Sequence, residues 1–485
     1  MNSSTELVGP ISKLPCSSFC TFTAFRVKDA KVVWKNRNLM TAYSLDAIED
    51  FDDWLLTHFA YTTLNSFYTN KEDDCSVFLA ERYGGQLLAG NGGGGRVGLK
   101  GQFQCKGIGP TPLVNPKGPL QYSIGLATLE EMLNEALWGE VCHKLLPHGS
   151  VRCLAVIELG CINNDNERYA IAVRENELRL GHFELSPYFS VNHLPNLVSE
   201  ERRVIASIES FPTCFSAVFG DYLDFRSSME TILYRYAEQL SYARLFRICH
   251  GSLTSSNIGL SGKYLDYGTI SSLGVYENVA TSRGNFGFLD EHNNILDSIV
   301  NFVDNYNWYS PNQYIDSSQL CHFFLDALHQ ISRDNFLMAL GIKRKDGNFD
   351  ILKADLVYED IHRYLTMGGN KKQYGVPYNN CGNCFNNIIN LVRCLRDPIN
   401  CSSDIERRIC NYVYEIVVSI DGFGLDYFLS KCNRIIRHGF NLDFLHYDEV
   451  RKEIRNIMSN VDLDSDISDY FNSILHEVEN LKELL

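Results

Sequence analysis

The hydrophobic pattern of the chain changes near residue 190, and this change constrains the fold more than any other feature. Before it, alternating apolar and polar residues predict a strand over 96–106 and two or three strands within 151–184. After it, apolar residues recur at helical spacing over 227–248 and again from about 295 onward. The order predicts an α+β protein with a β-rich lobe first, a mostly helical lobe second, and a crease between them suited to a ligand.

One helix is expected inside the β-rich part, directly after a loop at 106–119 that is rich in glycine and proline. The apolar residues at positions 129, 132, 133, 136 and 137 fall at helical spacing. Thr128 and Glu131 form the pattern of a capping box at the start of this helix.

The composition limits the classes of ligand that the protein can bind. The net charge of −15 and the isoelectric point near 5.4 argue against nucleic acid as a partner, because phosphate neutralisation needs a basic surface. A bound polyphosphate therefore needs a local cationic pocket and a metal ion.

The sequence also predicts a cytosolic protein. No run of about 18 apolar residues is present, so no membrane span is expected. The segment MNSSTELVGPISKLP lacks the basic and apolar regions of a secretory signal. The 16 cysteines are expected to be free thiols, and the single CxxC at Cys381 and Cys384 has no second pair to complete a zinc site.

A glycine-rich segment, AGNGGGGRVGLKG at 89–101, precedes the first of these predicted strands. Glycines such as Gly93 and Gly95 allow backbone N–H groups to approach phosphates, and Arg96 adds positive charge. The segment is therefore a candidate phosphate loop, although a flexible surface loop has the same composition.

Lys106 ends the predicted strand, and Glu130 lies on the helix that follows. A strand lysine held by a helix glutamate is the phosphate-binding pair of kinase-like folds. The glycine-rich KGIGPTP that begins at Lys106 favours this interpretation. A surface lysine and a solvated glutamate are the alternative.

Arg174 and Arg179 lie on or between predicted strands, just before the residues GHFE. Two guanidinium groups can hold a polyphosphate through bidentate hydrogen bonds. Ordinary surface arginines are again the alternative.

The segment HGSLTSSN at 250–257 ends in Asn257, and Asp266 follows within KYLDYG. Asn257 and Asp266 offer the oxygen ligands that Mg²⁺ prefers, and such a pair beside a nucleotide is typical of phosphoryl- and nucleotidyl-transfer enzymes. His250 is expected to shape the turn rather than to transfer protons.

These motifs resemble those of the selenoprotein O family, also called the YdiU family, of AMP-transferring pseudokinases. GGGGRVGL, KGIGPTP and EEMLNEA are similar to the family's GDGRA-type loop, its KGxGPTP motif and its REFLASEA helix. LRLGHFE and the pair HGSLTSSN and LDYG are similar to its LRFGHFE, HGVLNTDN and IDYG. FRVKDAKVVWKNRNLM resembles its N-terminal segment, so the resemblance covers roughly residues 20–290.

The resemblance implies a bilobal protein-kinase-like fold that binds ATP, flipped relative to kinases, with Mg²⁺ or Mn²⁺. The implied catalytic residues are Lys106 and Glu130, as the ion pair on the phosphates, and Asp266. The implied nucleotide-binding residues are Gly93, Gly95, Arg96, Lys106, Arg174 and Arg179, although the two arginines are spaced two residues closer than in the family. The implied metal ligands are Asn257 and Asp266.

The resemblance also divides the chain into four parts. An N-terminal extension over 1–80 is expected to pack on the kinase-like core. It precedes a β-rich nucleotide-binding lobe over 81–190, the catalytic-loop part of the helical lobe over 191–300, and a helical C-terminal extension over 301–485.

The family pattern is incomplete in this sequence. The aspartate that precedes the metal asparagine, the family's proposed base, is Ser256, and the aspartate of the GDGR loop is Gly94. An acidic Asp-Gly pair is missing near Gly118 and Pro119.

Loss of the base alone predicts a particular acceptor. A hydroxyl acceptor gains roughly 10²–10⁴ in rate from a positioned base. A carboxylate, with a pKa near 4, is already ionised at neutral pH. The sequence therefore favours transfer of AMP from ATP to a carboxylate, giving an acyl-adenylate and pyrophosphate.

The acceptor is then expected to be a peptide or protein, and the activated acyl group can pass to a partner acyltransferase. Divergent relatives resemble components of siderophore-peptide (microcin) maturation systems, in which a peptide C-terminus is activated. Two alternatives stay open. One is an ATP-binding pseudoenzyme that acts as a scaffold, and the other is AMP transfer to Ser, Thr or Tyr hydroxyls.

Overall fold

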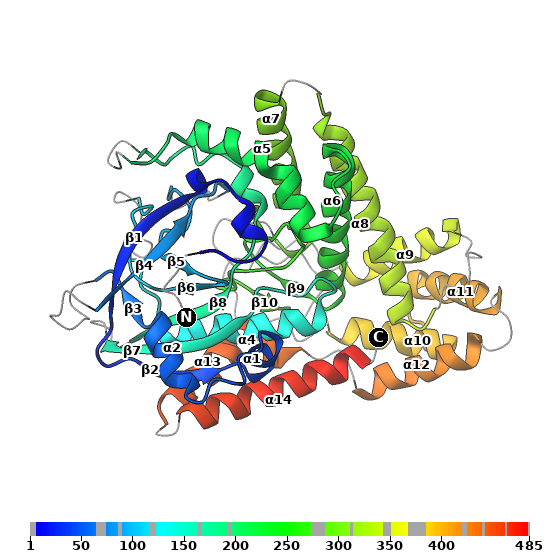
Figure 1. Cartoon of the computed structure of the whole chain (residues 1–485). Coiled ribbons are helices and arrows are strands. Elements are labelled where there is room, and N and C mark those ends of the chain that lie inside the picture. The colour runs from blue at the N-terminus through cyan, green and yellow to red at the C-terminus, as the bar shows by residue number, and fades with distance from the viewer. Residues whose placement is uncertain are drawn as a thin grey trace.

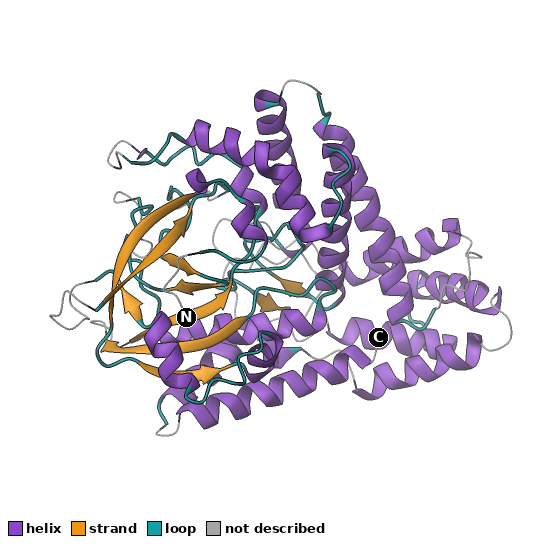
Figure 2. Ribbon diagram, in the orientation of Figure 1, coloured by secondary structure: helices purple, strands orange, loops and turns teal. Residues whose placement is uncertain are grey.

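The computed structural model describes residues 6–64, 74–85, 90–115, 123–162, 167–191, 194, 196–273, 287–310, 314–342, 351–366, 385–419, 424–438, 442–460 and 463–483. They form two lobes (Figure 1). The strands gather in one lobe, and helices make up nearly all of the other (Figure 2). The predicted α+β architecture with two lobes is therefore confirmed.

The first lobe is built on an eight-stranded antiparallel sheet in the order β2-β7-β8-β6-β5-β4-β1-β3. Its strands are β1 (Phe19–Arg26), β2 (Lys31–Lys35), β3 (Tyr61–Thr62), β4 (Cys75–Glu81), β5 (Val97–Lys100), β6 (Phe103–Lys106), β7 (Cys153–Ile162) and β8 (Arg168–Glu175). Residues 1–80, predicted as an extension packed on the core, thus supply strands to the sheet itself.

The single strand predicted over 96–106 is wrong, because this segment forms the hairpin β5–β6. Val97 lies opposite Lys106 and Lys100 opposite Phe103. The chain reverses at Gly101, whose φ of +63° is accessible to glycine and strained for other residues. Apolar and polar residues keep alternating across the turn, so the sequence pattern gives no sign that the chain changes direction there.

Two strands, β7 and β8, form within 151–184. The third predicted segment, ELRLGHF, instead contains a short 3₁₀ helix over Leu180–Phe183. Arg179 comes directly before this turn, and its side chain contacts both Glu81 of β4 and the Ser256 carbonyl.

The helix predicted after the glycine-rich loop is α4 (Leu129–Leu145). Thr128 accepts a hydrogen bond from the Glu131 backbone N–H at 3.2 Å, which confirms the predicted cap. The Glu131 side chain instead forms an ion pair with Arg96. α4 is buried on nearly all sides, between β7 and β8 on one side and the C-terminal helices on the other.

The sheet has an apolar core on each face. One face packs against α1 (Arg37–Ala42) and α2 (Phe51–Phe59). The other packs against α4, and this second core continues without a break into the helical lobe.

The helical lobe begins with α5 (Glu200–Phe219) and α6 (Phe225–Leu245), and α6 confirms the helix predicted over 227–248. The short strands β9 (Ile248–Cys249) and β10 (Ser271–Ser272) pair beside the loop that contains HGSLTSSN. The later helices are α7 (His292–Tyr309), α8 (Ser317–Ala339), α9 (Ile351–Thr366), α10 (Phe385–Arg396), α11 (Asp404–Ser419), α12 (Gly424–His438), α13 (Tyr447–Met458) and α14 (Leu463–Glu483).

The helices α13 and α14 return to the first lobe and cover the outer side of α4 (Figure 1). Phe471 of α14 packs on Trp34 of β2, with ring centroids 5.2 Å apart. Arg168 of β8 donates to the Met458 carbonyl at 2.8 Å. The predicted C-terminal extension therefore includes two helices that pack on the β-rich lobe.

None of the helices in the described ranges is long and apolar enough to cross a membrane. The cysteines whose side chains are described form no disulfide, as predicted. Cys381, Cys384, Gly118 and Pro119 lie outside the described residues.

Candidate active site

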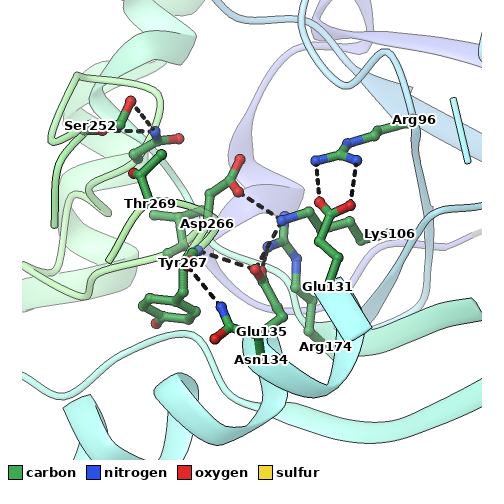
Figure 3. A network of polar contacts seen from close by, with 12 residues as sticks. Arg96, Lys106, Glu131, Asn134, Glu135, Arg174, Ser252, Asp266, Tyr267 and Thr269 are labelled. Atoms are coloured by element: carbon green, nitrogen blue, oxygen red, sulfur yellow. Dashed lines mark hydrogen bonds and ion pairs between the residues drawn. The ribbon is translucent and has the colours of Figure 1, made fainter. Parts of the chain in front are cut away.

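A buried lysine joins the two lobes at the crease. Lys106 ends β6, and its Nζ lies 2.9 Å from Glu135 Oε2 and 2.7 Å from Asp266 Oδ1 (Figure 3). The Lys106 and Glu135 side chains are each 1% exposed, whereas that of Asp266 is 37% exposed. Asp266 is thus the member of this cluster that solvent, a metal ion or a ligand can reach.

The predicted partner of Lys106 was the wrong glutamate of α4. Glu130 instead binds Arg455 of α13, with Nη2 3.1 Å from Oε1, and lies 3.4 Å from Arg451 Nη1. Five residues of helix turn a side chain by roughly 140° beyond a full turn, so Glu130 and Glu135 face different neighbours. A signal was present, because Glu135 lies within the apolar stretch of α4, where a charge must be paired.

Arg174 contributes to the same cluster from β8. Its Nη1 forms an ion pair with Glu135, and its Nη2 lies 3.3 Å from Gln104 Oε1. The side chain is 2% exposed. Arg174 therefore lies behind Lys106, where it neutralises Glu135 and does not face the crease as a phosphate clamp.

Arg179 occupies a separate position beside the HGSLTSSN loop. Its Nη2 lies 2.6 Å from Glu81 Oε1, and its Nη1 donates to the Ser256 carbonyl at 2.9 Å. Its guanidinium also lies over the Tyr83 ring, 4.5 Å from the centroid. In this structure Arg179 fixes the loop to the sheet, and the two predicted arginines do not form a pair.

Charge around Asp266 keeps it ionised. Burial alone would raise the pKa of Asp266, but Lys106, Arg96 and Arg174 outweigh burial and hold that pKa well below its usual range. The same balance lowers the pKa of Glu135, where Lys106 and Arg174 outweigh burial. Both carboxylates are therefore negative at neutral pH, as a metal ligand and a lysine anchor must be.

The glycine-rich segment is packed inside the lobe, so the surface-loop alternative is wrong. Gly93 has a φ of +132°, and a Cβ there would lie 2.2 Å from the Glu81 carbonyl oxygen. The N–H groups of Gly94 and Gly95 donate to the carbonyls of Glu81 and Gly93, both at 2.8 Å. To bind phosphates as predicted, these N–H groups would have to give up their hydrogen bonds to the carbonyls of Glu81 and Gly93.

This packed loop also positions Arg96. Thr111 of KGIGPTP donates its hydroxyl to the Gly94 carbonyl at 2.8 Å and its N–H to the Gly95 carbonyl at 2.9 Å. Arg96 follows directly and binds Glu131 of α4 at 2.7 Å (Figure 3). Arg96 is partly exposed and lies on the same side of α4 as Lys106, so it can supply positive charge to the crease.

Asn257 is fixed next to Asp266 by the backbone. Asn257 donates its Nδ2 to the Ser252 carbonyl at 2.8 Å, and its carbonyl accepts from the Leu265 N–H at 3.2 Å. His250 is fully buried, and its Nε2 lies 3.0 Å from the Leu265 carbonyl. His250 therefore has the structural position expected of it.

The oxygens of Asn257 and Asp266 fit a magnesium ion. Because Nδ2 of Asn257 is engaged, its Oδ1, which accepts a contact of 3.4 Å from Ser256 Oγ, is the atom that would bind a cation. Mg²⁺ typically takes one or two protein oxygens and completes its shell with phosphates and water. Within the described ranges no three His, Cys, Asp or Glu side chains converge on a metal site, so this pair does not extend to an all-protein cage.

The position of the family's base is occupied by hydroxyls. Ser256 Oγ lies 2.8 Å from Thr254 Oγ1, while Ser255 donates to Glu184 Oε2 at 2.7 Å. Burial raises the pKa of Glu184 to about 7, and its Oε1 has no hydrogen-bond partner among the residues that the structure describes. Glu184 ends the GHFE motif, and its sequence pattern gives no sign of the burial that raises its pKa.

Comparison with known proteins agrees with these motifs. Residues 11–332 match the family described as protein adenylyltransferase SelO. Protein nucleotidyltransferase YdiU of Burkholderia thailandensis is 27% identical over 317 residues, covering 62% of this chain and 51% of the relative. Its namesake in Burkholderia vietnamiensis is 28% identical over 218 residues, covering 42% and 38%.

The chain spans about half the length of the first of these relatives. The matched region contains the sheet, α4, the Lys106 cluster and the HGSLTSSN loop. The chain therefore belongs to the protein adenylyltransferase SelO family.

Proposed function

We propose that this protein transfers AMP from ATP, with a divalent cation, to an acceptor carboxylate. The observation that carries the proposal is the position of Lys106 Nζ, in contact with both Glu135 and Asp266 where the two lobes meet. A lysine held by a helix carboxylate, beside an Asp–Asn metal pair, is the arrangement used for phosphoryl and nucleotidyl transfer.

In this proposal each residue of the site has a distinct task. Glu135 and Arg174 hold Lys106 in place, so that its ammonium faces the phosphates of ATP. Arg96 adds a second cation beside them. Asp266 and Asn257 would hold Mg²⁺ or Mn²⁺, and the bound ion would neutralise phosphate charge and polarise the reacting phosphorus. Asp266 would hold the ion with the carboxylate that now contacts Lys106.

The acceptor follows from the hydroxyls at Thr254 and Ser256. The carboxylate nearest in sequence, Asp266, is bound to Lys106, and Glu184 is buried against Ser255. An acceptor that is already ionised needs neither as a base. A carboxylate oxygen attacks the α phosphorus, the bond to the bridging oxygen breaks, and pyrophosphate leaves with both electrons of that bond. No proton changes hands in this step.

A peptide C-terminus is the acceptor favoured by the resemblance to siderophore-peptide maturation components. The acyl-adenylate would then react with a nucleophile supplied by a partner acyltransferase. Transfer to protein hydroxyls is the competing function, favoured by the family's description as a protein adenylyltransferase.

Labelled ATP separates these functions. The full-length protein is incubated with Mg²⁺ and ATP labelled at the α or the γ phosphorus, with peptides that have free or amidated C-termini. Hydroxylamine is added to trap an acyl-adenylate as a hydroxamate. We expect labelled AMP to be released from α-labelled ATP, and a peptide hydroxamate to form, only when the peptide has a free C-terminus. Transfer of γ label, or equal α labelling of amidated peptides, would contradict the proposal.

Substitution of Asp266 tests the metal assignment. Asp266→Asn should lower AMP transfer by about 10²–10³-fold, because one charged ligand of the metal and its field on the phosphates are lost. The control is Asp448→Asn, which changes an exposed carboxylate of α13 and should leave the rate unchanged. Ser256→Asp should leave carboxylate activation in place and add labelling of hydroxyls; a variant without this gain would weaken the acceptor argument.

A further inference from the structure

A pocket of about 600 Å³ opens on the helical lobe, and none of the candidate active-site residues lines it. Its lining residues belong to α6, α7, α8 and α9. Its volume falls within the range of small-molecule sites. The polar side chains that line it include Arg244, His292, His329, Ser332, His362 and Arg363.

Two arginines and three histidines line this pocket, although the protein as a whole is strongly acidic. Arg244 comes from α6, Arg363 from α9, and the three imidazoles from three different helices. Glu359 is the only carboxylate among the lining residues in the described part of the chain. With the imidazoles neutral, the two arginines exceed Glu359 by one positive charge, and protonation of the histidines would add to it, as a specific anion site requires.

Arg244 has capacity for a further acceptor. Its Nη2 donates to the Leu289 carbonyl at 2.9 Å and to His292 Nδ1 at 3.0 Å. Its Nε is buried and has no hydrogen-bond partner among the described residues. Because Nε is buried, a ligand in the pocket would meet the guanidinium through its terminal nitrogens, beside the contact with His292.

The histidines do not form a metal site. Across the described ranges, no three His, Cys, Asp or Glu side chains approach closely enough to hold a metal ion. His292 Nδ1 accepts from Arg244, and a guanidinium so close opposes a second cation. The chemistry of the lining therefore favours an anion over a metal.

The inner end of the pocket is apolar. An adjoining cavity of about 40 Å³ shares Arg244 and Tyr358 with the larger pocket, and Leu245, Phe288 and Phe336 line it. It has room for the edge of a small apolar group beside the guanidinium. A ligand with a charged end and an apolar body matches both parts.

We propose that this helical-lobe pocket is a second ligand site, which binds a small organic oxyanion. The ligand carries a carboxylate or phosphate on a compact apolar group, and Arg244 is its main ionic partner. The site is independent of the nucleotide site and of the function proposed for it.

Proton uptake accompanies binding at this site. Burial and the neighbouring Arg244 charge both lower the pKa of His292, so this ring is neutral before the anion binds. A bound anion favours the protonated rings, so affinity rises as pH falls from 8 to 6. The charged groups that face or flank the pocket are Arg244 of α6, Asp290 and Glu291 before α7, His292 of α7, His329 and Arg333 of α8, and Asp355, Glu359, His362 and Arg363 of α9.

Benzoate, phenyl phosphate and the neutral benzamide test the proposal, by calorimetric titration of the full-length protein. We expect both anions to bind and benzamide to bind at least tenfold more weakly. Benzoate should bind at least threefold more tightly at pH 6 than at pH 8. Binding of benzamide equal to that of benzoate, or affinity that falls with falling pH, would overturn the proposal.

Variants locate the binding. Arg244→Gln should weaken benzoate binding at least tenfold. His329→Gln, at a side chain that is 45% exposed, keeps the test valid should Arg244→Gln fail to fold, and should weaken binding about threefold at pH 6. His322→Gln, on an exposed part of the same helix, is the matched control. Unchanged affinity in both pocket variants, or loss of benzoate binding in Lys106→Met, would place the anion elsewhere and refute the site.

Discussion

The two sides of α4 use the same chemistry in different surroundings. On the sheet side Glu135 binds Lys106 and Arg174, and all three side chains are at most 2% exposed. On the outer side Glu130 binds Arg455, whose side chain is 63% exposed. The first cluster is buried and lies beside Asp266, whereas the second joins α4 to α13 through an arginine that is largely exposed. Both glutamates form ion pairs, so the difference in exposure of their partners, and not the pairing itself, distinguishes the candidate active-site cluster from the contact between α4 and α13.

Glu135→Gln should have the largest effect. The amide leaves Lys106 and Arg174 buried without their counter-charge, and breaking one partner of a buried pair costs about 3–5 kcal/mol. We expect the free energy of unfolding, measured by urea denaturation, to fall by that amount, and AMP transfer to be lost. A Glu135→Gln protein with wild-type stability and activity would show that the cluster is not the centre of the site.

Glu184→Gln should have an intermediate and pH-dependent effect. Glu184 is buried and forms no ion pair with any residue that the structure describes, and burial raises its pKa to about 7. The folded state therefore holds a proton that the unfolded state releases near pH 4.5. The stability of the wild type falls as pH rises from about 4.5 to about 7, and the loss is complete above that range.

The variant lacks this titration. Its stability relative to the wild type should increase across the same window, by up to about 3 kcal/mol at pH 8, because one pKa unit corresponds to about 1.4 kcal/mol. Urea denaturation at pH 5 and pH 8 measures the difference. A relative stability that is constant between the two pH values would mean that Glu184 is ionised throughout.

Glu130→Gln should have the smallest effect. The Arg455 side chain is 63% exposed and that of Glu130 12% exposed, and an ion pair with one exposed partner contributes about 0–1 kcal/mol. A double-mutant cycle with Arg455→Gln should give a coupling energy below about 1 kcal/mol and leave AMP transfer near the wild-type rate. A loss of transfer in Glu130→Gln comparable to that of Glu135→Gln would remove the distinction between the two sides of α4.

The sequence predicted the architecture and the main motifs but not the pairings. The two lobes, the Thr128 cap and the placement of Lys106 beside Asp266 follow from patterns that are local or come from the resemblance. The choice between Glu130 and Glu135 depends on which side of a fully buried helix meets the sheet. Hydrophobic periodicity cannot decide this, because α4 has apolar residues on every side.

The arginines and glycines show a second limit. The residue types of Arg174, Arg179 and Gly93 predicted contacts with phosphates. In the structure the two arginines form ion pairs with Glu135 and Glu81, and the Gly93 backbone packs against the Glu81 carbonyl. The acceptors Glu135 and Glu81 lie 39 and 98 residues away in the chain. Pairings over such distances appear only once the sheet is assembled.

The return of α13 and α14 to α4 has a consequence for synthesis on the ribosome. α4 ends at Leu145 and α13 begins at Tyr447, so roughly 300 residues separate the helix from its cover. At about 5–20 residues per second, the outer side of α4 stays bare for about 15–60 s after it is made. A nascent chain thus carries Lys106, Glu135 and Asp266 for this time before α13 and α14 cover the outer side of α4.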